Sequence, residues 1–219
     1  QIFLHAPVTI NLSDRNEDQF RILCNDLNYA SEVQADAYVI TAGRKREKTE
    51  EVAFANVIKN VEEAYEKSNF NGKILIRNTG GSGSQYGNSL ETIKKIHESH
   101  EAIGIALDFA EAFNYGYNLL GLSGIQSFKE EVERLIGWEN IDLFYLNDTN
   151  SFCGSQKESA VMWGEGIIGK EGYDEILKWI PIYDLGPIIA EYVTNKGHYY
   201  NITRYLLEHR TTKRRGWST

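Results

Sequence analysis

The sequence predicts a parallel α/β fold of the (β/α)-barrel type, with six strand-helix units in its 219 residues. Six short apolar runs recur along the chain, and the segments between them carry apolar residues at a period near 3.6. Strands that are apolar throughout are buried on both faces, so they belong to a parallel sheet covered by helices. Each run also ends in a polar side chain, where parallel α/β folds place their functional residues.

The first three units are predicted from the amino terminus to about residue 97. Continuous apolar runs predict strands over 2–5, 37–41 and 74–76. A helix over 16–35 is predicted because its apolar residues share one face, and a second helix is predicted over about 49–67. The third helix is short and carries Leu90, Ile93 and Ile96.

The last three units repeat the same order. Strands are predicted over 103–108, 141–146 and 187–191. The helix after the first of them carries Ile125, Phe128, Val132 and Leu135, and the other two helices are predicted over 172–179 and about 199–209. The domain therefore covers 1–209, and a basic tail covers 210–219.

Six units are fewer than the eight of a closed barrel, which typically takes about 250 residues. Either the sheet is open, or the barrel has lost two units, or other residues supply them. Unpaired edge strands are sites of aggregation. We therefore expect the two edges to be covered by another protein chain or by an N-terminal segment outside this sequence.

The net charge, the length of the apolar runs and the cysteine count limit the expected partners and compartments of this protein. A formal net charge of -8 gives no overall basic field, so DNA binding is expected to be weak and local, and the concentrated basic stretch 210–215 lies in the tail. No apolar run approaches the roughly 18 residues of a membrane span, so no membrane partner is expected. Two cysteines, Cys24 and Cys153, do not suggest a disulfide framework and fit a reducing compartment such as the cytoplasm.

The strand ends present an unusual set of charges. A ring containing His5, Asp108, Glu158 and Glu191 has the side chains that hold divalent metal ions. Arg77 ends the third strand and belongs to the same ring. A guanidinium in that position repels a cation and brings its own hydrogen-bond donors.

Six segments in order resemble the endonuclease IV family of AP endonucleases. They are HAPVTINL at 5–12, IRNTGGSGS at 76–84, LDFAEAF at 107–113, YLND at 145–148, WGEG at 163–166 and EYV at 191–193. The resemblance extends from residue 2 to about 207. The turn 191–194 and the loop 147–165 look most like those of members carried by large DNA viruses. A virus particle is therefore an expected location of this protein, besides the cytoplasm.

The resemblance implies a TIM barrel that cleaves DNA at abasic sites with three zinc ions held by nine His, Asp and Glu ligands. Zinc generates a hydroxide nucleophile near neutral pH and neutralises phosphoryl charge. Most of these ligands are altered. Nine positions correspond to the family's metal ligands. His5, Asp108 and Glu191 match the family, and Glu158 replaces an Asp. The other five ligands are replaced by residues of other types, namely Thr41, Arg77, Glu111, Tyr145 and Ala160.

The substitutions predict that Arg77 occupies the vacated metal position and forms ion pairs with Asp108, Glu191 or both. Tyr145 is expected to be a buried, hydrogen-bonded residue beside them. The chain is then a non-catalytic barrel without a metal cofactor, acting as a structural, DNA-binding or protein-binding subunit of a viral or DNA-processing assembly. The alternative is a metal-dependent AP endonuclease whose reduced zinc site contains His5, Asp108, Glu158 and Glu191.

Overall fold

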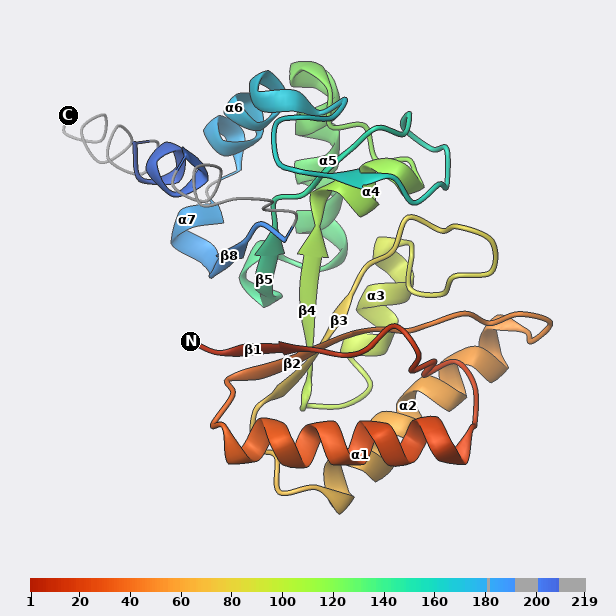
Figure 1. The fold of residues 1–219 in the computed structure, drawn as a ribbon. Coiled ribbons are helices and arrows are strands. Elements are labelled where there is room, and N and C mark those ends of the chain that lie inside the picture. Colours follow the sequence, from red (N-terminus) through yellow and green to blue (C-terminus); the bar gives the residue numbers. More distant parts are fainter. Residues whose placement is uncertain (181, 192–200, 209–219) are drawn as a thin grey trace.

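The computed structural model describes residues 1–180, 182–191 and 201–208. Its main sheet has six strands in the order β1-β2-β3-β4-β5-β8, and every neighbouring pair is parallel (Figure 1). The predicted fold class and the six parallel strands are confirmed. The sheet is a half-barrel with β1 at one edge and β8 at the other.

The strands of this sheet are short and match the predicted runs closely. Their bounds are Phe3–His5 for β1, Ala37–Thr41 for β2, Lys73–Arg77 for β3, Ile103–Asp108 for β4, Ile141–Tyr145 for β5 and Ile188–Ile189 for β8. β2 to β5 are buried almost throughout, whereas β1 and β8 are only partly buried. The centre of the sheet is therefore its most protected part.

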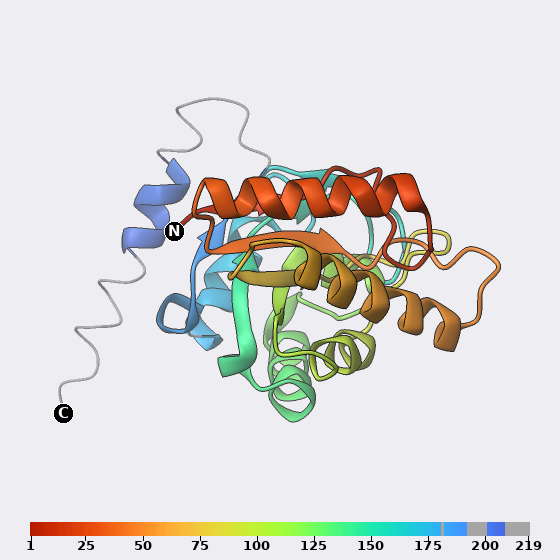
Figure 2. The ribbon, with the colours of Figure 1, turned by 90° about the horizontal axis from the view of Figure 1, so that it is seen from below.

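The helices lie outside the strands (Figures 1 and 2). Their bounds are Glu17–Glu32 for α1, Glu50–Lys67 for α2, Leu90–His97 for α3, Phe109–Tyr115 for α4, Gly121–Leu135 for α5, Gly169–Trp179 for α6 and Ile182–Leu185 for α7, with a 3-10 turn at Trp138–Asn140. Asn16, Thr49 and Ser89 cap α1, α2 and α3 by accepting hydrogen bonds from backbone amides. These side-chain caps fix where the first three helices begin.

Two apolar layers hold the half-barrel together. The larger layer lies between the helices and the outer face of the sheet. The smaller one lines the inner face and contains Ala37, Val39, Leu75, Ala106, Leu143 and Tyr145, with Phe3 and Ile189 packed against it. Because neighbouring strands are parallel and in register, their carboxyl ends lie on one rim, where Thr41 pairs with Arg77 and Asp108 pairs with Tyr145.

Several elements differ from the prediction. The short helix α4 and the antiparallel ribbon of β6, Asp148–Thr149, and β7, Ala160–Val161, were not predicted. α6 begins three residues earlier than expected, at Gly169. Residues 201–208 are helical, while the remainder of the helix expected over 199–209 and the basic tail 210–219 lie outside the described residues.

None of the helices in the described part of the chain is long and apolar enough to cross a membrane.

Candidate functional site

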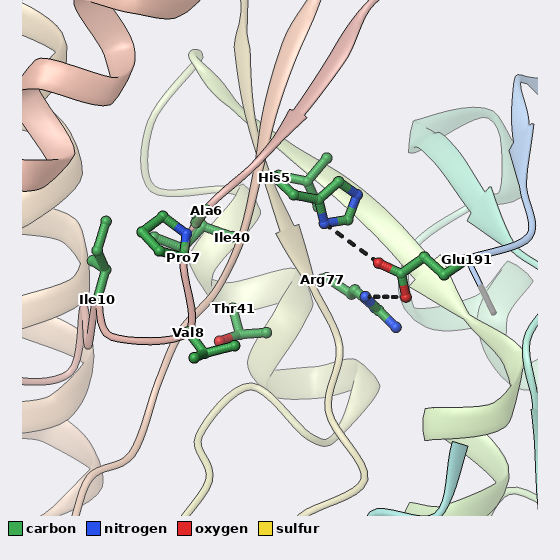
Figure 3. Close-up of a pocket in the computed structure, with 10 residues that line it drawn as sticks. His5, Ala6, Pro7, Val8, Ile10, Ile40, Thr41, Arg77 and Glu191 are labelled. Carbon is green, nitrogen blue, oxygen red and sulfur yellow. Dashed lines mark ion pairs between the residues drawn. The ribbon is translucent and has the colours of Figure 1, made fainter. Parts of the chain in front are cut away.

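A cavity of about 360 Å³ opens at the carboxyl ends of the first strands (Figure 3). His5, Arg77 and Glu191 point toward one another at one end of it, and Pro7, Val8 and Thr41 lie further along. Its lining consists of His5, Ala6, Pro7, Val8, Ile10, Val39, Ile40, Thr41, Arg77 and Glu191. One end of the cavity is therefore charged, and much of its wall is apolar.

Arg77 bridges two carboxylates at this end. Its Nη2 lies 2.5 Å from Asp108 Oδ2, and its Nη1 lies 2.9 Å from Glu191 Oε2. The Arg77 side chain is 14% exposed and that of Asp108 is fully buried. Burial alone would lower the pKa of Arg77, but Asp108 and Glu191 raise it above its ordinary value. Arg77 therefore forms an ion pair with each of the two carboxylates.

Asn147, just beyond β5, joins the same two carboxylates. Its Nδ2 donates to Asp108 Oδ2 at 2.9 Å and to Glu191 Oε2 at 3.2 Å, and its Oδ1 accepts from the Glu191 amide at 3.0 Å. Asn78 holds the Asp108 backbone from the other side, with bonds of 2.6 and 3.0 Å. Both asparagines stand within the quoted motifs, but neither was assigned to the site from the sequence.

Tyr145 and His5 form the inner wall of the cluster. The Tyr145 hydroxyl lies 2.5 Å from His5 Nε2, and His5 Nδ1 lies 3.5 Å from Glu191 Oε1. The Arg77 guanidinium lies 4.3 Å above the centre of the Tyr145 ring, a cation–π contact. Burial lowers the pKa of His5, an effect that Glu191 opposes and Arg77 reinforces. Tyr145 is fully buried, and its hydroxyl is hydrogen-bonded to the His5 ring.

Glu111 lies one helical turn beyond Asp108. The Asp108 carboxylate caps α4 by accepting from the Glu111 amide at 3.1 Å, and this bond fixes the start of the helix. The Glu111 carboxylate accepts from the Gly80 amide at 2.5 Å. Burial and the neighbouring Asp108 raise the pKa of Glu111 to about 7, although Arg77 opposes the shift.

The other former metal positions are placed differently. Thr41 lines the cavity beside Arg77. Glu158 is 53% exposed and contacts Arg44 at 3.5 Å and the Gln85 amide, both on neighbouring loops. Ala160 begins β7 and has no ligand atom. The structure therefore brings together His5, Arg77, Asp108, Tyr145 and Glu191, and directs Glu158 toward other partners.

The fold and its rim of polar side chains define a member of the (β/α)-barrel class. The model of the xylose isomerase-like TIM barrel family matches residues 1–210, so the chain belongs to this family. The probable endonuclease 4 of Carboxydothermus hydrogenoformans is 31% identical over 196 residues, which make up 87% of this chain and 69% of that protein. The Aquifex aeolicus protein of the same name is 30% identical over 186 residues, 81% of this chain and 65% of the relative. The chain spans about two thirds of the length of these relatives.

Solved structures share the fold. Endonuclease IV from Thermus thermophilus superposes with a TM-score of 0.79 and 21% identity, over 94% of this chain and 75% of that one. A D-tagatose 3-epimerase-like protein superposes with a TM-score of 0.74 and 18% identity, over the whole of this chain and 80% of the other. Together with the sequence relatives, they confirm the expected TIM-barrel fold and the resemblance to endonuclease IV.

The residues present do not fit the zinc ions that the resemblance implies. The Arg77 guanidinium takes one oxygen of Asp108 and one of Glu191, so these oxygens already have a cationic partner. Within the described part of the chain, no group of three His, Cys, Asp or Glu side chains is arranged to hold a metal. A dication beside a permanently charged guanidinium is also opposed electrostatically.

Proposed function

We propose that this chain is a non-catalytic, endonuclease IV-like barrel that acts as a structural or binding subunit of a larger assembly. The observation that supports the proposal best is Arg77, which bridges Asp108 and Glu191 at 2.5 and 2.9 Å. In this arrangement one guanidinium neutralises carboxylates that metal ions would neutralise in a trinuclear zinc centre.

Metal-dependent hydrolysis of a phosphodiester needs a bound hydroxide and a cation near the leaving oxygen. Arg77 could supply only positive charge, and two of its donors already face carboxylates. Breaking the pair with Asp108 would leave a fully buried carboxylate without its cation, which costs about 3–5 kcal/mol in comparable sites. The resting arrangement therefore opposes both metal entry and the transfer of Arg77 to a phosphate.

A protein partner suits the rim of the half-barrel better than DNA does. The loop after β2 is rich in basic residues, but four of its side chains are already close to carboxylates. Arg44 contacts Glu158, Lys45 contacts Glu50, and Arg46 and Lys48 both contact Asp14. Paired charges release few counterions when they meet phosphate, so they contribute little to affinity for DNA.

The edges of the sheet give such a partner a place to bind. β1 and β8 each pair with one neighbour in the six-stranded sheet. The inner-face residues Phe3 and Ile189 lie on these two edge strands and are only partly buried. We propose that another chain, or residues beyond this segment, pairs with these edges and completes the barrel.

Metal content and cleavage of an abasic-site duplex test the proposal together. The purified protein is analysed for zinc, then incubated with the duplex in the presence of added zinc or of a chelator, with Thermus thermophilus endonuclease IV as the positive control. We expect substoichiometric zinc and no chelator-sensitive cleavage. Stoichiometric zinc together with cleavage that Asp108→Asn abolishes would instead establish a reduced metal site of His5, Asp108, Glu158 and Glu191.

A further inference from the structure

The cavity at the rim has an excess of negative charge at its polar end. Two carboxylates, Asp108 and Glu191, lie against one guanidinium, that of Arg77. No other Lys or Arg side chain belongs to the described lining of the cavity. Counted over the formal charges of these three groups, with Asp108 buried behind the lining, the polar end carries one surplus negative charge. An anionic ligand is therefore disfavoured there.

One oxygen of Glu191 has room for a further donor. Glu191 Oε2 receives Arg77 Nη1 and Asn147 Nδ2. Among the described residues, Oε1 faces only the His5 ring, at 3.5 Å, which is longer than an ordinary hydrogen bond. The Glu191 side chain is 26% exposed and lies in the cavity lining, so this oxygen can be reached from solvent. Thr41 lies further along the same lining, away from this oxygen.

The rest of the wall suits methylene groups. Ala6, Pro7, Val8, Val39 and Ile40 present apolar atoms around the polar end. A volume of about 360 Å³ falls within the range of sites that hold small ligands, about 300–1,000 Å³. A ligand with a cationic tip and an aliphatic stem would therefore match both parts of the cavity, as long amphipathic side chains do elsewhere in proteins.

We propose that this cavity binds an alkylammonium group, with the ammonium on Glu191 Oε1 and the methylene stem on the wall formed by Ala6, Pro7, Val8 and Ile40. The ligand class includes a lysine side chain of a partner and a free polyamine. The inference rests on the proposed function, because it requires Arg77, and not a metal ion, to occupy the space between Asp108 and Glu191.

The test is an NMR titration of the full chain, following the backbone amides of Val8, Ile40 and Thr41. The probes are n-butylammonium, the neutral n-butanol and the anionic butyrate, which share one stem. We expect saturable shifts with n-butylammonium alone. Nα-acetyl-lysine methylamide and 1,5-diaminopentane then separate the two sources, because the tighter ligand identifies a lysine side chain or a polyamine.

Two variants report on the polar contacts. Glu191→Gln should weaken n-butylammonium binding at least about tenfold, because a charge-assisted hydrogen bond is lost. Thr41→Lys places a tethered ammonium in the same lining and should weaken binding a few-fold by competition, which provides a second readout if Glu191→Gln does not fold. Glu63→Gln is the matched control. Glu63 is 29% exposed and lies 2.9 Å from Arg15, much as Glu191 faces Arg77, but it lies on α2 outside the cavity lining.

Equal shifts with n-butanol, or unchanged binding in both Glu191→Gln and Thr41→Lys, would overturn the inference. No binding of n-butylammonium would also overturn it, while the proposed function would stand if zinc and cleavage are absent. Zinc that binds stoichiometrically and displaces n-butylammonium would overturn the proposed function itself. A failure of this inference can therefore be distinguished from a failure of the proposed function.

Discussion

At the scale of single residues, one substitution changes what the strand ends can do. Arg77 has the length to reach both Asp108 and Glu191, and a guanidinium offers its donors in a planar fork that suits two carboxylates at once. Asn147 supports the arrangement by donating to the same two oxygens. The described contacts of the cluster are hydrogen bonds and ion pairs between residues of this chain.

Replacing Arg77 by Met should destabilise the protein by about 3–5 kcal/mol, because two carboxylates lose their cation and Asp108 stays fully buried. Urea unfolding followed by circular dichroism measures the change. Adding Asp108→Asn to Arg77→Met should restore part of the loss, since the buried charge is removed. A loss below about 1 kcal/mol in the single variant would show that the pairs contribute little.

Glu111 gives the protein a pH dependence with a defined sign. Its folded pKa is raised to about 7 from an ordinary value of 4.5. The folded state therefore holds this proton more tightly than the unfolded state, and the associated stability is lost as pH rises from about 4.5 through 7. The Glu111→Gln variant has no ionisable group at this position, so its stability does not fall in this way as the pH rises.

The Gln variant should therefore match the wild type near pH 4.5 and exceed it above pH 7 by about 1–3 kcal/mol. The free energy of unfolding of both proteins, measured across this pH range, gives the difference directly. The control variant Glu17→Gln, at an exposed position on α1, should show no such divergence. A difference between Glu111→Gln and wild type that does not grow with pH would contradict the raised pKa.

At the scale of elements, sequence periodicity predicted the long amphipathic helices and the buried strands because burial on one face, or on both, leaves a regular pattern. α4 has no such pattern. Phe109, Ala110, Ala112, Phe113 and Asn114 are all buried, so the helix is enclosed on every side. β6 and β7 have two residues each, too few for an alternation to appear.

The sequence likewise predicted some residues of the candidate site and missed others. Charged side chains at strand ends identified Arg77, Asp108 and Glu191, because parallel strands bring their carboxyl ends to one rim. Asn147 was missed because a neutral amide gives no charge signal. Its role depends on two separate segments, the end of β5 and Glu191, meeting in space. The orientation of the Glu158 side chain likewise depends on the positions of loops, which sequence periodicity does not predict.

Asp148 joins two elements that the sequence did not connect. It is fully buried, and its carboxylate accepts from the amides of Thr149, Gly166, Ile168 and Gly169 at 2.8–3.1 Å. α6 begins at Gly169 without a side-chain cap from its own N-cap residue, so Asp148 supplies acceptors there from about 20 positions earlier in the chain.

Asp148→Asn should lower the free energy of unfolding by about 2–4 kcal/mol, because an amide group replaces one acceptor oxygen and faces buried N–H donors. Chemical denaturation measures the loss, and Asp18→Asn serves as the control because the Asp18 side chain is 81% exposed. Equal small effects of the two substitutions would show that the loop before α6 is held by other contacts.

At the scale of the whole molecule, the half-barrel leaves stability unevenly distributed. β3 and β4 each have two strand neighbours and are almost fully buried, whereas β1 and β8 each have one neighbour in the main sheet. Amides exchange through local openings whose free energy is lowest where contacts are fewest. The isolated chain should therefore show fast hydrogen exchange at β1 and β8 and slow exchange at β3 and β4, measured by mass spectrometry of peptides from each strand.

The same measurement tests the proposed completion of the barrel. A partner or segment that pairs with both edges would protect β1 and β8 together and leave β3 and β4 unchanged, because the central strands already have their hydrogen bonds. Peptides from α2 on the outer face serve as the internal control, since α2 lies away from the open side. If β1 and β8 of the isolated chain are as protected as β3, the edges are already satisfied and no partner strand is needed there.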